Sequence, residues 1–282
     1  MHRVMADHGG RQPDGLIKRG LTKMGELDGR VAVITGGTRG IGRAIAEAFL
    51  REGAQVVING RDVAKGQRAV QEMNGGDNVT FVQGDAAIRE DCDRLIDETV
   101  AHFGRIDILV NNAGGASNHA PVAEITDEAM DNALKLNLWS TLWCSRKALA
   151  HMIPQQWGRI INISSLEGKV GKAGISIYVT AKHAVNGLTK SMAHEVGTLG
   201  ITVNALCPGA IETDMMKDEG TKAAASMGMA YEDLLAWFAS ESAIKRLNDV
   251  EDVAMFASLL ASEAGAGITG SLLSIDGGSA PY

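Results

Sequence analysis

The sequence is short of cysteine, of aromatic residues and of positive charge, and it has no long apolar run. Its three cysteines, Cys92, Cys144 and Cys207, are odd in number and far apart, which argues against a secreted disulfide scaffold and indicates a reducing compartment such as the cytoplasm. The net charge is −7, and no cluster of Lys and Arg could follow a phosphate backbone, so we expect no nucleic-acid partner. No stretch approaches the roughly 18 apolar residues of a membrane span, so we expect no membrane association.

Metal-binding patterns are missing as well. The seven histidines form no His-Glu-x-x-His arrangement and the cysteines form no close pair, so we expect no metal site. What the chain does have is 45% hydrophobic and 22% charged residues over 282 positions, which is typical of one globular domain. Residues 1–25 show no apolar periodicity and contain turn-forming clusters, so we interpret them as a mobile extension of a domain at 26–282.

From about residue 27 onward, short apolar runs alternate with amphipathic stretches. This alternation is typical of βαβ units, in which helices cover a parallel sheet. It predicts the α/β class, as a single doubly wound domain with a seven-stranded parallel sheet and helices on both faces. Strands are expected near residues 31–35, 55–59, 79–83, 106–110, 159–163, 202–207 and 272–275. Helices are expected near residues 41–51, 63–73, 91–103, 127–151, 178–198 and 250–262.

A glycine-rich turn joins the first predicted strand to the first predicted helix. It reads Thr-Gly-Gly-Thr-Arg-Gly-Ile-Gly over residues 35–42. Glycines let the backbone turn sharply and approach a ligand, and the helix start offers free N–H groups, as the pyrophosphate of a dinucleotide requires. The alternative is a glycine-rich connection without a ligand. The turn residues expected to bind a cofactor are Gly36, Thr38, Arg39, Gly40, Ile41 and Gly42.

The glycine spacing, Thr-Gly-x-x-x-Gly-x-Gly, resembles that of the short-chain dehydrogenase/reductase family and differs from the commoner Gly-x-Gly-x-x-Gly pattern. The resemblance continues through Asn-Asn-Ala-Gly at 111–114, Ser165, Tyr-Val-Thr-Ala-Lys at 178–182 and Pro-Gly at 208–209. It covers the chain from about residue 27 to the C-terminus, and the order of the motifs makes it specific. It implies a Rossmann-type dinucleotide-binding and catalytic domain. Within the family the chain looks most like 3-oxoacyl thioester (acyl-carrier-protein) reductases and polyketide ketoreductases.

The end of the second predicted strand bears on the choice between NADP and NAD. A carboxylate there bonds the ribose 2′-hydroxyl of NAD, whereas a basic residue accepts the 2′-phosphate of NADP. The family's NAD-binding members place Asp where Gly60 stands, while here Arg61 follows and Arg39 can approach. Because guanidinium groups grip phosphate in a fork, we predict NADP, with NAD as the alternative. Asp62 keeps that alternative open, since it could either reach the 2′-hydroxyl or cap the next helix.

The resemblance implies further cofactor contacts beyond the glycine turn. Asp85 matches the family's adenine contact, and residues 112–114 match the segment that lines the ribose on the nicotinamide side. The contacts implied outside the turn are Arg61, Asp85, Ala86, Asn112, Ala113, Gly114, Tyr178, Lys182, Pro208, Gly209, Ile211 and Thr213.

Tyr178 and Lys182 lie four residues apart at the start of a helical stretch, so their side chains share one face. Ketone reduction needs an acid for the forming alkoxide, and a nearby ammonium would bring the pKa of a tyrosine toward the working range. The resemblance implies that Tyr178 is the general acid/base and that Lys182 lowers its pKa and bonds the nicotinamide ribose. It also implies that Ser165, 13 residues before Tyr178, holds the substrate carbonyl. Asn137, 28 residues before Ser165, would anchor a water that links Lys182 to solvent.

Each of these four residues could also have an ordinary structural role. Tyr178 and Lys182 could be a surface helix pair, Ser165 a turn residue, and Asn137 a satisfied polar group in a helix. Their joint spacing favours an active site.

Residues 212–246 contain methionines, leucines, Trp237 and Phe238, and we expect an apolar substrate lid there. Such a lid suits a small-molecule or thioester-linked carbonyl substrate, with a 3-oxoacyl group or a similar apolar ketone. One alternative is an NAD-dependent dehydrogenase of a small secondary alcohol such as 3-hydroxybutyrate, although Glu167 does not suit an anion and only Lys169 or Lys172 could reach one. The other alternative is a non-catalytic NADP-binding sensor.

Self-association is also expected. The predicted helices near 127–151 and 178–198 are apolar on more than one face, and such helices tend to pair with a second subunit. Because the resembling family mostly forms tetramers, we expect a homotetramer or a homodimer.

Overall fold

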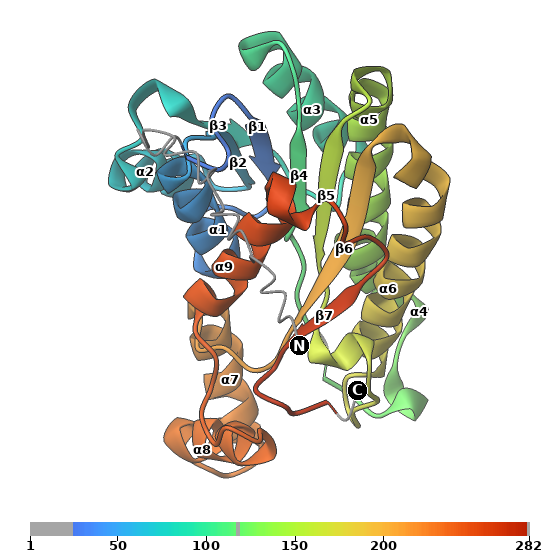
Figure 1. Ribbon diagram of the computed structural model, residues 1–282. Coiled ribbons are helices and arrows are strands. Elements are labelled where there is room, and N and C mark those ends of the chain that lie inside the picture. The colour runs from blue at the N-terminus through green and yellow to red at the C-terminus, as the bar shows by residue number, and fades with distance from the viewer. Residues whose placement is uncertain (1–24, 117–118, 281–282) are drawn as a thin grey trace, which may run out of the picture.

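A computed structural model describes residues 25–116 and 119–280 of the chain (Figure 1). The expected mobile extension, residues 1–25, lies outside the described residues apart from Gly25. The described chain has three layers, in which a central sheet lies between two groups of helices.

All seven strands pair in parallel, in the order β3-β2-β1-β4-β5-β6-β7. The chain builds one half of the sheet outward from β1 and then the other half from β4, so its winding reverses between these two strands. This confirms the predicted doubly wound parallel sheet. The strand bounds are β1 Val31–Ile34, β2 Gln55–Gly60, β3 Val79–Gln83, β4 Ile108–Asn111, β5 Gly158–Ile163, β6 Ile201–Pro208 and β7 Leu272–Ile275.

The helices follow the predicted alternation with two differences. The helix expected at 127–151 is divided by a π-helical turn, Lys135–Trp139, and the expected lid segment forms two separate helices. None of the helices in the described ranges is long and apolar enough to cross a membrane. The α-helices are α1 Gly40–Arg51, α2 Val63–Met73, α3 Arg89–Phe103, α4 Asp127–Leu134, α5 Ser140–Gln155, α6 Ser176–Val196, α7 Asp214–Ser226, α8 Tyr231–Glu241 and α9 Val250–Ala261.

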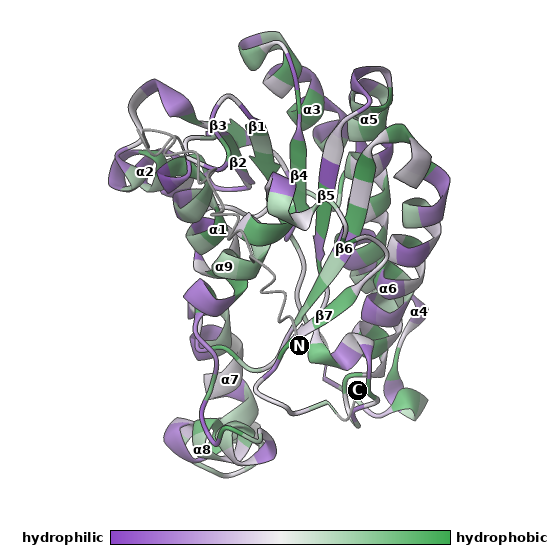
Figure 2. Cartoon of the chain, in the orientation of Figure 1, coloured by the Kyte–Doolittle hydropathy of each residue, from purple (hydrophilic) through white to green (hydrophobic). Residues whose placement is uncertain are grey.

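Two apolar clusters, one on each side of the sheet, form the core. Successive side chains of a strand point to opposite faces, so a continuous apolar run such as β1, with all four residues buried, can pack on both sides. One cluster joins Ile34 of β1 to Phe49 of α1 and Val253 of α9. The other joins Val33 of β1 to Leu95 of α3. Figure 2 shows the strands coloured largely hydrophobic, as such burial requires.

Asp107 anchors the amino-terminal edge of this sheet, just before β4. Its fully buried carboxylate accepts the Val31 N–H at 2.9 Å and the Nε and Nη2 donors of Arg105 at 2.8 and 2.6 Å. Arg30 lies 3.7 Å away. One carboxylate therefore satisfies a buried backbone donor and faces two guanidinium groups.

We expect Asp107→Ala to lower the free energy of unfolding by about 3–5 kcal/mol, because it leaves the Val31 N–H and the Arg105 guanidinium without an acceptor. Urea denaturation followed by circular dichroism measures this change. Asp97→Ala is the control, since it removes an exposed partner of Lys147 and should cost at most about 1 kcal/mol. Equal losses for the two variants would contradict the anchoring role.

Candidate active site

The glycine turn lies between β1 and α1 at the carboxyl edge of the sheet. Gly36 has a φ of +63° and Gly40 a φ of +56°, values that favour glycine. A Cβ at Gly36 would lie 3.1 Å from the Asn112 side-chain nitrogen. Arg39, the N-cap of α1, makes no side-chain hydrogen bond to the helix start. The turn thus brings bare backbone and free N–H groups to one place, which fits a pyrophosphate.

Asn112 and Thr35 hold this turn against the end of β4. The Asn112 amide donates to the carbonyl oxygens of Thr35 and Gly36 at 2.9 and 3.1 Å. The Thr35 hydroxyl accepts the N–H groups of Asn112 and Ala113 at 3.0 and 2.9 Å. Because both sides of this contact come from expected cofactor segments, the structure joins the glycine turn and residues 112–114 into one surface.

A cavity of about 370 Å³ lies beside the turn, between α1, α2 and α7. Thr38 lines it and also lies against Gly60, where a Cβ would come within 2.9 Å of the Thr38 methyl carbon. The cavity is therefore next to the end of β2, where a 2′-phosphate would be read. Five cations and three carboxylates line it: Arg39, Arg43, Lys65, Arg68 and Lys217 with Glu72, Asp214 and Asp218.

Of the two arginines expected to bind the 2′-phosphate, only Arg39 lines the cavity. Arg61 is exposed and is not among the residues lining the cavity. Arg39 does line it, where it pairs with Asp218 of α7 at 3.4 Å. Asp62 caps α2, since its carboxylate accepts the Lys65 N–H at 3.0 Å. Of the two roles expected of Asp62, binding the ribose 2′-hydroxyl of NAD or capping the next helix, the structure shows the cap.

Sequence reasoning missed the other cations of the cavity. Lys65 and Arg68 lie three residues apart in α2, directly after β2, so they share a helix face. Their spacing after β2 was the sequence pattern that could have indicated a phosphate-binding role. Arg43 and Lys217 come from α1 and α7, and only the folded chain brings them together.

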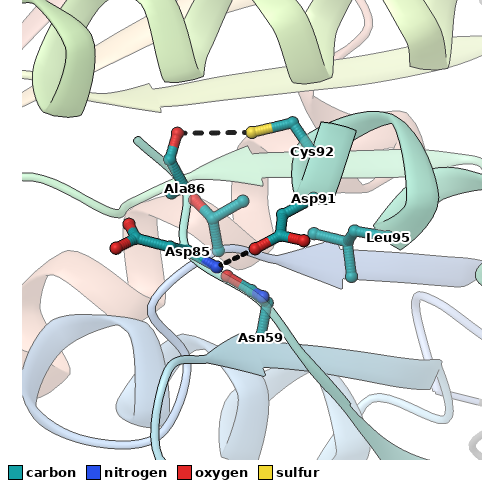
Figure 3. Close-up of a pocket in the computed structure, with 7 residues that line it drawn as sticks. Asn59, Asp85, Ala86, Asp91, Cys92 and Leu95 are labelled. Carbon is teal, nitrogen blue, oxygen red and sulfur yellow. Dashed lines mark hydrogen bonds between the residues drawn. The ribbon is translucent and has the colours of Figure 1, made fainter. Parts of the chain in front are cut away.

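Asp85 and Ala86 follow β3 in a loop that α3 fixes. Figure 3 shows the Asp91 carboxylate accepting the Asp85 N–H, at 2.8 Å, and the Cys92 thiol donating to the Ala86 carbonyl, at 3.3 Å. The pKa of Asp91 lies below its usual value, because the Asp85 N–H and Arg94 both stabilise the carboxylate. These contacts fix the Asp85 loop at the carboxyl end of β3.

Ser165 and Tyr178 come together where β5 and α6 meet. Ser165 is 6% exposed and caps the short 3-10 helix Leu166–Gly168. Burial raises the pKa of Tyr178 well above its usual range, although a hydrogen bond with the Ser165 side chain opposes that shift. The Glu167 carboxylate raises the Tyr178 pKa further. The phenol is therefore protonated at neutral pH and can act as an acid.

Lys182 lies one turn further along α6 and is almost fully buried. Its Nζ donates to the Ile163 carbonyl at 2.9 Å and lies 5.5 Å from the centre of the Tyr178 ring. Burial lowers the pKa of Lys182 to about 8. The expected lowering of the Tyr178 pKa by Lys182 stays a prediction for the cofactor-bound protein, because burial dominates both groups in this structure.

Asn137 lies in the π-helical turn between α4 and α5, a feature that is frequent at functional sites. Its amide oxygen accepts the Gly115 N–H at 3.0 Å, and its Nδ2 donates to the Gly115 and Ala133 carbonyls at 3.1 and 3.0 Å. A Cβ at Gly114 would lie 2.7 Å from Asn137 Oδ1 and 3.2 Å from Lys182 Nζ. Gly114 therefore lies between the side chains of Asn137 and Lys182.

The last expected cofactor residues follow β6 and lead into α7. Ile211 is buried, and a Cβ at Gly209 would lie 2.9 Å from the backbone of Asp276, so this segment is tightly packed. Thr213 caps α7 by accepting the Met216 N–H at 3.2 Å, and its methyl group would contact a Cβ at Gly40. Pro208 ends the strand. The start of the expected lid therefore lies on the glycine turn.

The chain between residues 30 and 224 matches the sequence model of the short chain dehydrogenase family. The chain belongs to that family. It is 36% identical over 252 residues to the 3-oxoacyl-acyl-carrier-protein reductase of Vibrio cholerae, covering 89% of this chain and 98% of the relative. It is 35% identical over 260 residues to 3beta-hydroxysteroid dehydrogenase 2 of Eggerthella lenta, covering 91% and 96%.

A solved member of the family has the same fold. A single-residue variant of actinorhodin polyketide ketoreductase, solved with NADPH, superposes with a TM-score of 0.86 at 30% identity, over 90% of this chain and 98% of that one. Short-chain dehydrogenases bind NAD or NADP and interconvert alcohols and ketones, and this chain is an oxidoreductase of that kind.

Proposed function

We propose that this short-chain dehydrogenase reduces a ketone to a secondary alcohol with NADPH, and that its substrate carries a 3-oxoacyl or similar apolar carbonyl group. The observation that carries the proposal is the meeting of Ser165, Tyr178 and Lys182 beside the glycine turn segments. When bound, NADPH supplies a hydride to the carbonyl carbon.

Four side chains bind the ligands and transfer the proton. Tyr178 donates a proton to the carbonyl oxygen. Burial keeps its phenol protonated, and the Lys182 ammonium would bring its pKa toward the working range in the cofactor-bound protein. Ser165 orients the carbonyl oxygen. Lys182 bonds the nicotinamide ribose and presents a positive charge to Tyr178. Asn137 binds the Gly115 backbone, lies across Gly114 from Lys182 and maintains the proton path.

The lid and its surroundings favour a neutral substrate over a free acid. Lys172, one of two lysines that could have bound a carboxylate, pairs with Glu241 at 3.5 Å and lies over the rings of Trp237 and Phe238. The Glu167 carboxylate lies in the site and would repel an anion. A test is NADPH oxidation with acetoacetyl thioester beside free acetoacetate. We expect faster turnover with the thioester, and faster turnover with the free acid would refute this substrate class.

NADPH should support a kcat/KM at least about tenfold above that of NADH, because a charge-assisted phosphate contact in the basic cavity is worth roughly 1.5–3 kcal/mol. Gly60→Asp combined with Arg39→Ala, which removes a cation that lines the cavity, should reverse the preference, with a rotation of the Thr38 side chain to make room for the new carboxylate. Arg51→Ala, in the last turn of α1, is a matched control outside the cavity. Equal rates with both cofactors in the unmodified enzyme would show that the NADP assignment is wrong.

Self-association is proposed on the outer face of α4 and α5. Trp139 is 44% exposed and stacks on Trp143 with ring centres 5.9 Å apart. Trp143 is half-buried, and an exposed tryptophan stacked on it is typical of a surface that a partner subunit covers. We expect the mass of a dimer or tetramer by light scattering at micromolar concentration, and Trp139→Glu should shift that mass downward. A monomeric unmodified protein would contradict the proposal.

A further inference from the structure

Glu167 places a carboxylate against the hydroxyl of Ser165. The Ser165 Oγ donates to Glu167 Oε2 at 2.5 Å and accepts the Glu167 N–H at 3.2 Å. Glu167 lies in the 3-10 helix that follows β5 and is partly exposed. The hydroxyl that would orient the substrate is thus held by a side chain to which the reaction so far assigns no task.

The charge of Glu167 is directed into the site. Ser165 is the side-chain partner of its carboxylate within the described part of the chain. The two nearest lysines in the sequence point to other groups, Lys169 to the Ser274 hydroxyl at 2.9 Å and Lys172 to Glu241 at 3.5 Å. Glu167 also raises the pKa values of Tyr178 and Lys182, which shows that its charge acts on the other site residues.

We propose that Glu167 determines substrate specificity by binding a hydroxyl group on the carbon next to the substrate carbonyl. This inference rests on the proposed ketone reduction, in which Ser165 holds the carbonyl oxygen. Within the proposed class of apolar carbonyl substrates it favours a hydroxyketone over a 3-oxoacyl group, which carries no hydroxyl at that carbon. Because Ser165 Oγ and Glu167 Oε2 lie in hydrogen-bond contact, the ligand groups that bind them must be close neighbours. Oxygens on adjacent carbons meet that condition, since they lie about one hydrogen-bond length apart.

The exchange of hydrogen bonds favours such a ligand. The substrate hydroxyl donates to the carboxylate, in a charge-assisted bond, and the Ser165 hydrogen turns to the carbonyl oxygen. A ketone without the hydroxyl takes the Ser165 hydrogen away from Glu167 and leaves the carboxylate without a donor. A carboxylate ligand meets repulsion, and an ammonium ligand meets the charge of Lys182. A neutral hydroxyketone with an apolar chain under the lid satisfies all of these groups.

Three ligands of one carbon skeleton test the inference: 1-hydroxy-2-hexanone, 2-hexanone and 2-oxohexanoate. With NADPH, the unmodified enzyme should reduce the hydroxyketone with a kcat/KM about tenfold or more above that of 2-hexanone, and 2-oxohexanoate should be the slowest. Glu167→Ala should bring the ratio of the first two close to one, mainly through a higher KM for the hydroxyketone. Glu167→Gln keeps an acceptor oxygen without the charge, so its ratio should lie between these values.

Glu128→Gln, at an exposed position in the first turn of α4, is the control and should keep the unmodified ratio. An unmodified enzyme that reduces both ketones equally well, or a Glu167→Ala enzyme that keeps the preference, overturns the role of Glu167 and leaves ketone reduction standing. If neither these ligands nor a wider ketone panel oxidise NADPH, the proposed function falls, and the inference falls with it. Should Glu167→Ala not fold, the near-isosteric Gln variant decides, and an unchanged ratio there overturns the inference.

Discussion

Tyr178→Phe should lower kcat/KM for ketone reduction by about 10² to 10⁴ and leave NADPH affinity nearly unchanged. The substitution removes the phenolic acid, and the loss of one general acid lies in this range. The ring itself remains, so its packing and its position 5.5 Å from Lys182 Nζ should persist. Steady-state rates with any accepted ketone measure the first effect, and NADPH titration by fluorescence measures the second.

Two controls make the Tyr178 result interpretable. An unchanged thermal unfolding midpoint shows that the fold survives the loss of a hydroxyl that contacts Ser165. Ser165→Ala, which keeps the acid but removes the orienting hydroxyl, should also lower turnover. A Tyr178→Phe enzyme with near-normal turnover would mean that these residues are not the active site, and a cofactor-binding sensor would then be the better interpretation.

Lys182→Met should damage both turnover and cofactor binding. We expect kcat to fall by about 10² or more and the Kd for NADPH to rise by about tenfold, because one ammonium is proposed to serve Tyr178 and the nicotinamide ribose. Met fills a similar volume, so the packing of the buried chain should be kept. Rates and fluorescence titration on the same preparation separate the two effects. A variant that loses turnover but binds NADPH normally would confine Lys182 to proton transfer.

The pH dependence of Lys182 gives an independent check. Burial lowers its pKa from 10.5 to about 8, so the unmodified enzyme should lose activity as the pH rises through about 8. Between about pH 8 and 10.5 the unfolded chain holds a proton that the folded chain has released, so this group's contribution to stability rises with pH across that window. Both the activity decline near pH 8 and this rise should be absent from Lys182→Met.

The fold was largely predictable because its signals are local. A strand buried on both faces appears as a short, continuous apolar run, as in β1, and turns and amphipathic stretches separate such runs. Every strand lies within two residues of its expected position. The π-helical turn at Asn137 was not predictable in this way, because the bonds that accompany it reach Gly115, 22 residues away.

The same difference between local and long-range signals applies to the candidate site. The glycine turn and the Tyr178–Lys182 pair depend on neighbouring residues, so they could be predicted from the sequence. The basic cavity depends on α1, α2 and α7, whose cations are far apart in the chain. Glu167 is close to Ser165 in sequence, yet the hydrogen bond between their side chains depends on the backbone conformation of Ser165, which is extended and leads into a 3-10 helix. Contacts of that kind require the folded chain.

Deuterium transfer from labelled NADPH tests directly whether the enzyme reduces a ketone. NADPH labelled with deuterium at C4 of the nicotinamide, prepared separately as each of the two epimers, is incubated with the enzyme and an accepted ketone, and the product alcohol is analysed by mass spectrometry. We expect one epimer to give an alcohol with one deuterium on the former carbonyl carbon, and Tyr178→Phe to form this product at least about a hundred times more slowly. An enzyme that binds NADPH but yields no labelled alcohol from either epimer would not be a ketone reductase of this kind.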